Sequence, residues 1–267
     1  MKRVLTIQDL SCLGKCSLTV ALPVLSVMGC AATALPTGVL SSHTAFPHPH
    51  VKDLTGEIVP ICRHWQQIGA EFDGVAVGYL SDPMQAEAVE TVLEAFPVFT
   101  VIDPVMGDHG KPYSRITPDH VQAMKVLCAK GTVLLPNVTE ACMLTGMPYR
   151  EEGDAGWFRE LLDAMGQFGA EAVIITGTAT EPDSLGFAGC RNGACFSYQA
   201  QRLPGKYHGT GDLFAAAFTG GVMGGLQIPE AAKLAAVFIE RVIKATPQES
   251  LFGVDFESQL PWLQAQL

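Results

Sequence analysis

The sequence predicts one α/β domain over residues 1–267, with a doubly wound, mostly parallel central sheet and helices on both of its faces. Two observations favour this fold. Short runs rich in aliphatic and β-branched residues alternate with segments of helical pattern, and the short runs are apolar at consecutive positions. Strands that are apolar on both sides are typical of a parallel sheet covered by helices on both faces. No repeat, low-complexity tract or linker divides the chain.

Strands and helices are expected to alternate along the chain. The expected strands are RVLTIQ (3–8), CAATALPTGVL (30–40), GVAVGYL (74–80), VFTVIDPVMGD (98–108), GTVLLPN (131–137) and EAVIITG (171–177). The segments expected to be helical are SLTVALPVLSVMG (17–29), DLTGEIVPICRHWQQIG (53–69), PMQAEAVETVLEAF (83–96) and the apolar run LFAAAF (213–218). Ligands bind beyond the carboxyl ends of the strands in such sheets, so polar residues after the strands are candidates for a site.

Polar residues follow most of the expected strands and are predicted to converge on one edge of the sheet. They are Gln8, Asp9, residues 41–44, residues 79–82, Asp103, Asp108, Asn137, Glu140 and residues 176–178. The segment GDHGKPYSRITP (107–118) contains Gly and Pro and is the longest polar interruption of the pattern. It is either a mobile flap over this edge or an inert loop.

The composition favours a small molecule as the ligand. The net charge is -10 at pH 7 and the basic residues form no cluster, so nucleic acids and anionic membranes are expected to be repelled. The sequence shows neither a signal-peptide pattern nor an apolar run of membrane-spanning length, which predicts a cytoplasmic protein with reduced thiols at its eight Cys. The Cys spacings match no zinc motif, and Pro47 and Pro49 make the His-rich segment 43–50 an irregular loop rather than a metal site.

The stretch HGTGDLF (208–214) places two glycines and a carboxylate ahead of the last apolar run. Gly209, Thr210 and Gly211 can present bare backbone N–H groups, and the positive end of the following helix adds to them, so this turn is a candidate anion site. Asp212 beside it suits phosphoryl transfer, in which a base takes a proton from the attacking hydroxyl while N–H dipoles hold the charge on the phosphate. The alternative is that Asp212 only caps the helix.

A second oxygen-rich pair lies in NVTE, at the end of the strand expected at 131–137. Asn137 and Glu140 offer hard oxygens suited to Mg²⁺, directly or through water. The alternative is a capping box, with Asn137 as the helix N-cap and Glu140 closing it. The sequence contains no P-loop lysine motif, so a Walker-type nucleotide site is excluded.

Taken together, these motifs resemble one family. They are LTIQD (5–9), LSSHTAF (40–46) followed by GY (78–79), DPVMGD (103–108), PNVTEACMLTG (136–146), IITG (174–177) and GTGDLFAAAF (209–218). In content and order they are similar to the vitamin B6 kinases, the pyridoxal kinase family of the ribokinase-like superfamily, over about residues 3–245. The resemblance implies ATP-dependent phosphorylation of the 5′-hydroxymethyl group of pyridoxal or its relatives by a homodimer. ATP and Mg²⁺ are implied with it, together with a monovalent cation such as K⁺.

The resemblance also implies a role for individual residues. Asp212 is the implied catalytic base, and Gly209, Thr210 and Gly211 form the implied anion hole. The other implied positions are Asp103 and Glu140 for the metal ion and phosphate, Asn137 and Thr176 for the nucleotide phosphates, Lys206, Tyr207 and His208 for the nucleotide pocket, and Asp9, His43, Thr44 and Tyr79 for the vitamer ring.

Two positions depart from the family pattern. Asp9 stands where the family commonly has Ser, and an ionised carboxylate can only accept hydrogen bonds, which favours a ring with a protonated nitrogen, an amine or a hydroxyl. Leu135 stands where the family often has Thr, so it offers a monovalent cation only its backbone carbonyl.

Two other functions remain open alternatives. One is a hydroxymethylpyrimidine kinase, whose substrate carries an exocyclic amine that could donate to Asp9. The other is a non-catalytic protein that binds a B6 vitamer or a nucleotide. A base beside an anion hole argues against the second alternative, because a binding protein has no chemical need for it.

Overall fold

A computed structural model describes residues 1–205, 207–247 and 251–266. Within this part of the chain, a nine-stranded sheet has the order β11-β10-β9-β8-β5-β4-β1-β2-β3. Its strands are β1 (Lys2–Ser11), β2 (Cys30–Leu40), β3 (Val51–Asp53), β4 (Gly74–Val77), β5 (Phe99–Ile102), β8 (Val133–Leu134), β9 (Ala172–Thr178), β10 (Ser184–Arg191) and β11 (Ala194–Gln201). A separate small hairpin pairs β6 (Gly107–Asp108) with β7 (Lys111–Pro112).

The six central strands, from β2 to β9, run parallel to one another. Antiparallel strands extend this parallel sheet on both sides, with β3 beside β2 and the β10–β11 hairpin beside β9. The predicted mostly parallel sheet is therefore confirmed. The β10–β11 hairpin was not predicted from the sequence, although its Asn192-Gly193 turn, with both residues at positive φ, is a typical two-residue hairpin signal.

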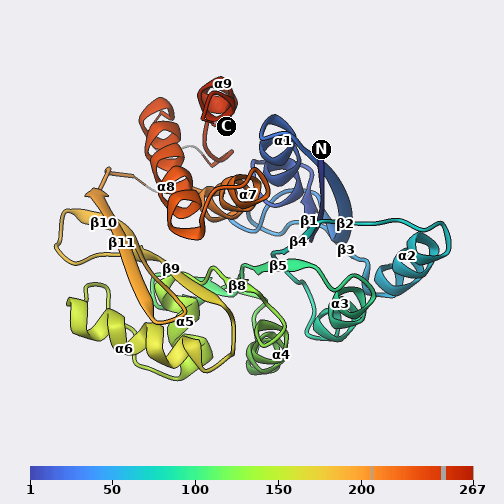
Figure 1. Cartoon of the computed structure of the whole chain (residues 1–267), viewed down its shortest axis with the longest axis horizontal. Helices are drawn as coiled ribbons and strands as arrows, with labels where there is room; N and C mark the ends of the chain where they lie inside the picture. Colours follow the sequence, from blue (N-terminus) through green and yellow to red (C-terminus); the bar gives the residue numbers. More distant parts are fainter. Residues whose placement is uncertain (206, 248–250, 267) are drawn as a thin grey trace.

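Helices cover both faces of the sheet (Figure 1). On one face lie α1 (Leu18–Val27), α7 (Thr210–Met223), α8 (Ile228–Ala245) and the short α9 (Leu260–Gln264). On the other face lie α2 (Thr55–Gln67), α3 (Met84–Ala95), α4 (Pro118–Cys128), α5 (Val138–Thr145) and α6 (Ala155–Gly166). Each layer has its own hydrophobic core against the sheet, which agrees with strands that are apolar on both sides.

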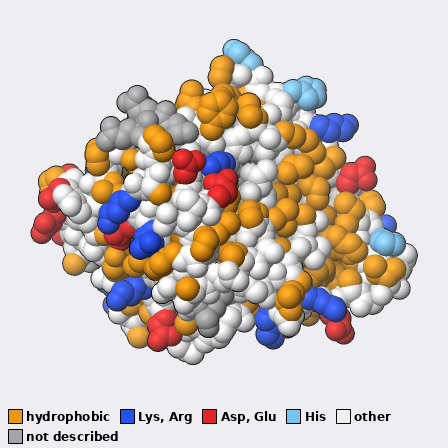
Figure 2. Space-filling model, turned by 90° about the horizontal axis from the view of Figure 1, so that it is seen from above, with side chains coloured by type: hydrophobic (Ala, Val, Ile, Leu, Met, Phe, Trp, Pro, Cys, Tyr) orange, Lys and Arg blue, Asp and Glu red, His pale blue; other side chains and the backbone are white. Residues whose placement is uncertain are grey.

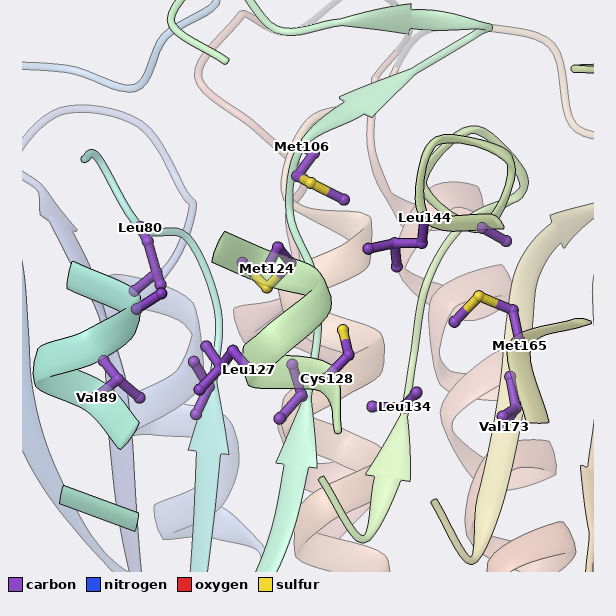
Figure 3. Close-up of a cluster of buried hydrophobic side chains, with 14 of the residues drawn as sticks. Leu80, Val89, Met106, Met124, Leu127, Cys128, Leu134, Leu144, Met165 and Val173 are labelled. Carbon is purple, nitrogen blue, oxygen red and sulfur yellow. The ribbon is translucent and has the colours of Figure 1, made fainter. Parts of the chain in front are cut away.

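The core beneath α4 and α5 anchors the edge of the sheet that carries the polar residues. Leu127 and Cys128 of α4 point toward the sheet, beside Leu134 of β8 (Figure 3). Met106, 1% exposed, extends this core to the start of the β6–β7 hairpin. The backbone around Met106, whose N–H donates to the carboxylate of Glu140, is therefore held in place by packed apolar side chains.

Charged side chains are interspersed on the face seen in Figure 2, and no basic cluster gathers there. In the described part of the chain, no helix is both long enough and apolar enough to cross a membrane. The eight cysteines form no disulfide within the described residues.

Candidate active site

The glycine turn at the start of α7, residues 209–211, is the candidate anion-binding part of the site. Gly209 is the N-cap of α7 and has a left-handed backbone with φ 85°, and as a glycine it has no side chain with which to cap the helix. A Cβ at this position would overlap the carbonyl oxygen of Lys15, so only glycine fits between this turn and the loop after β1. The first N–H groups of α7 have no acceptor within the helix and are available to an anion.

This packing makes Gly209 far less replaceable than an exposed glycine of the same conformation. Gly69 has φ 68° and a Cβ added there would meet no atom within 4 Å, so Gly69→Ala is expected to lower the free energy of unfolding by only about 1–2 kcal/mol. Gly209→Ala also has to displace the backbone of Lys15, so it should lower the free energy of unfolding by clearly more than Gly69→Ala does. Urea unfolding of both variants tests this, and equal losses would contradict the proposed close contact.

Asp212 lies in the first turn of α7, three residues after the N-cap. Burial raises the pKa of its carboxyl to about 7, the backbone N–H of Ser17 lowers it, and the nearby carboxylate of Asp9 raises it. The helix is capped by Gly209 without a side-chain bond, so the alternative that Asp212 is the capping residue is wrong. Near neutral pH, Asp212 can both hold and release a proton, as a general base must.

Two further carboxylates lie nearby. Asp103, which follows β5, is close to Asp212, and Glu140, in the first turn of α5, is close to Asp103. Glu140, 2% exposed, accepts hydrogen bonds from the backbone N–H groups of Met106 at 3.0 Å and Asn137 at 2.8 Å. Burial raises the pKa of Glu140 to about 8, although these hydrogen bonds act to lower it. Burial also raises the pKa of Asp103 well above its ordinary value, and Glu140 and Asp212 raise it further. A Cβ on Gly211 would lie 4.0 Å from Asp103 Oδ2, so Asp103 faces the start of α7.

The predicted capping box is present in addition to this charge cluster. Asn137 Oδ1 accepts from the Glu140 N–H at 3.0 Å, and Asn137 Nδ2 donates to the Gly107 carbonyl at 2.8 Å. Both alternatives for this pair can therefore hold together, because a carboxylate has about four acceptor positions and the box does not use them all. Thr176 pairs with Asn137 in an isolated parallel bridge, which places it at the same strand edge.

The buried acidic groups fit a divalent cation. Asp103, after β5, and Glu140, in the first turn of α5, supply hard oxygens, and Glu140 raises the pKa of Asp103, so a positive ion between them would relieve the repulsion. Among the described residues, no group of three or more His, Cys, Asp or Glu side chains could hold a metal ion. An ion bound here would therefore depend on water and phosphate oxygens for most of its ligands, as Mg²⁺ commonly does.

The polar segment 107–118 folds over these carboxylates. Its hairpin is anchored where the Gly110 N–H donates to Thr139 Oγ1 at 2.9 Å and the Tyr113 N–H donates to the Met106 carbonyl at 2.9 Å. Burial raises the pKa of the Tyr113 hydroxyl, and the nearest acidic groups, beginning with Glu140, raise it further. The segment thus covers the site, whereas its mobility stays a prediction.

Segment 107–118 also reaches the other side of the site through Arg115. Burial raises the pKa of Tyr79, and Arg115, which donates to the Tyr79 hydroxyl, lowers it. Sequence reasoning missed Tyr113 and Arg115 as site residues. Their only signal was their place in the polar segment that follows DPVMG.

Asp9 lies buried near the end of β1, 2% exposed. It accepts hydrogen bonds from Ser17 Oγ at 2.5 Å and Ser11 Oγ at 2.9 Å. Burial raises its pKa, while the two hydroxyls and the nearby His43 lower it. Each carboxylate oxygen already has one donor, so a ligand would be a third partner rather than the first.

His43, predicted to line the same side, has both ring nitrogens engaged. Nδ1 accepts from the Ala45 N–H at 3.2 Å, so the ring proton is on Nε2, which donates to the Leu251 carbonyl at 2.7 Å. Only the ring face and carbon edge of His43 remain for a ligand. Tyr79 is buried and Thr44 is exposed at this side.

The residues before the glycine turn were assigned to the nucleotide pocket. Lys206 lies outside the described residues. The Tyr207 hydroxyl donates to the Pro204 carbonyl at 2.6 Å, and the His208 ring lies 5.3 Å from the ring of His43. His208 is therefore on the His43 side of the turn, and a nucleotide contact for Tyr207 and His208 stays a prediction.

The chain matches a family model described as phosphomethylpyrimidine kinase over residues 22–252. A pyridoxine/pyridoxal/pyridoxamine kinase of Bordetella bronchiseptica is 31% identical over 91% of this chain and 89% of its own length. The structure of pyridoxal kinase from Lactobacillus plantarum is similar with a TM-score of 0.92 and 33% identity, covering 100% of this chain and 98% of that one. Pyridoxal kinase of Leishmania donovani, solved with ADP and pyridoxamine, has a TM-score of 0.89 and 25% identity, covering 99% and 96%.

Proposed function

The chain belongs to the phosphomethylpyrimidine kinase and pyridoxal kinase family, and from this membership we propose that it transfers the γ-phosphoryl group of ATP to the 5′-hydroxymethyl group of pyridoxal or a related B6 vitamer. The observation that carries the proposal is the position of Asp212, beside the glycine turn of α7 and opposite Asp103. The proposed base, anion hole and cation-binding carboxylate lie together there. These are the parts that phosphoryl transfer to an alcohol requires.

In the proposed reaction Asp212 accepts the proton of the 5′-hydroxyl group. The hydroxyl oxygen forms a bond to the γ-phosphorus of ATP as the bond between that phosphorus and the leaving ADP breaks. The N–H groups of the 209–211 turn hold the charge that develops on the transferred group. A pKa of about 7 suits Asp212 to this task, because it is largely ionised above neutral pH yet basic enough to take the proton.

Asp103 and Glu140 would hold Mg²⁺, which neutralises phosphate charge when it is bound. Asn137 and Thr176 lie at the same strand edge and are proposed to contact the nucleotide phosphates. The side chain of Leu135 is 3% exposed and packs in the core, so it offers no oxygen to a monovalent cation. The use of K⁺, the cytoplasmic location and the homodimer stay predictions.

The acceptor ring is proposed to bind between Asp9, His43, Thr44 and Tyr79. The electrostatic influence of Asp9 on Asp212 and on Tyr79 supports this, because it requires these groups to be near one another. A protein of Bacteroides thetaiotaomicron, provisionally assigned as a phosphomethylpyrimidine kinase, was crystallised with pyridoxal; it has a TM-score of 0.93 and 34% identity, covering 98% of this chain and 95% of that one. Hydroxymethylpyrimidine phosphorylation is the second candidate, favoured by the family model.

A panel of acceptors separates the candidates. With ATP and Mg²⁺, kcat/KM is measured for pyridoxal, pyridoxine, pyridoxamine and 4-amino-5-hydroxymethyl-2-methylpyrimidine. The proposal predicts that at least one B6 vitamer is preferred over the pyrimidine. Turnover of the pyrimidine alone would assign the second candidate, and ligand binding without turnover would favour the non-catalytic binding protein.

A further inference from the structure

The segment 251–257, which follows α8, contacts the loop after β1 and the loop that contains His43, both on the side where the acceptor is proposed to bind; we call it the C-terminal strap. Lys15, in the loop after β1, joins it by backbone and side chain. The Lys15 N–H donates to the Phe252 carbonyl at 2.9 Å. Its Nζ lies 2.9 Å from Asp255 Oδ1 and 2.7 Å from Glu257 Oε2.

The backbone of the strap is shaped for this contact. Gly253 has φ 93°, and a Cβ there would lie 2.8 Å from Lys15 Cβ. The Lys15 Nζ also lies 5.7 Å from the ring centroid of Phe256. Lys15 therefore sits against successive residues of the strap, which is more than an isolated surface ion pair provides.

The strap has a second anchor at the loop that contains His43. The Leu251 carbonyl accepts the proton of His43 Nε2, and Phe252 packs edge-on against Phe46 with 5.5 Å between ring centroids. These bonds fix the tautomer and the orientation of His43, whose ring lies against the ring of His208. The strap thus joins two loops that are proposed to enclose the acceptor.

Lys15 also touches the catalytic turn. Its carbonyl oxygen occupies the space that a Cβ on Gly209 would need. Two residues later, the backbone N–H of Ser17 bonds to the carboxylate of Asp212, and the Ser17 hydroxyl bonds to Asp9. A shift of Lys15 would therefore move groups that bond to the base and to the acceptor pocket together.

We propose that Lys15 is a positioning residue, which uses its ion pairs with Asp255 and Glu257 to hold the loop after β1 and the C-terminal strap together as the wall of the acceptor pocket. This inference rests on the proposed function. The bonds of the strap described above reach Lys15 and His43, on the acceptor side, and none reaches Asn137 or Thr176. Loss of the ion pairs is therefore expected to weaken acceptor binding much more than ATP binding.

The test compares Lys15→Met with Lys130→Met. Lys130 is a matched control, because it also pairs with two carboxylates. These are Glu90 and Glu94, which lie on α3 rather than on the C-terminal strap. In Lys15→Met the KM for pyridoxal is expected to rise about 5- to 10-fold, with the KM for ATP within about twofold of native. Lys130→Met should leave both constants native.

Three further variants separate positioning from general stability. The double variant Asp255→Asn/Glu257→Gln should raise the KM for pyridoxal as much as Lys15→Met does. Combining all three substitutions should raise it little further, because the double variant and Lys15→Met remove the same ion pairs. Lys15→Arg, which keeps the charge, should restore most of the pyridoxal affinity.

The outcomes separate the role of Lys15 from the proposed kinase function. Equal KM values in native and Lys15→Met proteins would overturn the role of Lys15 while leaving the proposed function intact. Parallel increases in both KM values with a lower Tm would overturn it as well, since they indicate only a structural role. Absence of turnover in the native protein would instead overturn the proposed function, and the proposal for Lys15 with it.

Discussion

Asp212→Asn is expected to lower kcat for B6-vitamer phosphorylation by about 10²–10⁴-fold, the range that a general base contributes. Asparagine has nearly the same size and keeps the position in the first turn of α7, but it cannot accept the proton of the attacking hydroxyl. The affinity for pyridoxal should change little, because the ring is proposed to contact other residues. Steady-state kinetics and a pyridoxal binding titration measure the two quantities.

The pH dependence gives a second measure of the same group. Burial raises the pKa of Asp212 to about 7, and only the ionised carboxylate can act as base. The kcat/KM of the native protein should therefore fall as the pH drops through about 7. Asp163→Asn, which changes an exposed carboxylate paired with Arg159, should keep both the rate and the pH profile. A native rate for Asp212→Asn would contradict the assignment of the base.

Asp103→Asn is expected to have opposite effects on activity and stability. The pKa of Asp103 is raised by burial, by Glu140 and by Asp212, which means that its ionised form is unfavourable in the folded chain. In the unfolded chain the same carboxyl has an ordinary pKa of about 4. Between that value and the raised one, the folded protein binds more protons than the unfolded protein, so its free energy of unfolding falls as the pH rises.

The same reasoning applies to Glu140, with a pKa of about 8, and to Asp212, with a pKa of about 7. Without Mg²⁺, the native protein should therefore have a lower Tm at pH 8 than at pH 6. Asp103→Asn should reduce that difference and raise the Tm at pH 8, because one of the three carboxyls no longer ionises.

The activity of Asp103→Asn should fall about 10- to 100-fold through weaker cation binding, as seen when metal sites lose a supporting group. Thermal unfolding at both pH values, with and without Mg²⁺ and ATP, measures the stability effect alongside the kinetics. A variant that is less stable than the native protein at pH 8 would contradict the repulsion between these carboxylates.

The sequence predicted the parts of the fold that depend on local pattern. The parallel strands are buried on both faces and read as continuous apolar runs, so β1, β4 and β9 were identifiable. The β10–β11 hairpin was not, because β11 is the edge strand and contains no buried residue, and β10 is interrupted by two glycines, so neither strand reads as a continuous apolar run. Its Asn192-Gly193 turn was the available signal.

The candidate site divides in the same way. Asp103, Glu140 and Asp212 follow strands or open a helix, so the topology of a parallel sheet alone brings them to one edge. Tyr113 and Arg115 depend on the path of a loop, which no periodicity specifies. The contact of Lys15 with Asp255 joins residues separated by 240 positions. Only a folded chain reveals such a pair, because neither side chain carries a local motif.

The most direct test of the central claim is the product formed from pyridoxal by the native protein. The protein is incubated with pyridoxal, ATP and Mg²⁺, and pyridoxal 5′-phosphate and ADP are quantified together by chromatography. Our account predicts equal amounts of the two products, formed at a rate that Asp212→Asn nearly abolishes. Release of ADP without pyridoxal 5′-phosphate, or equal product formation by Asp212→Asn, would contradict it.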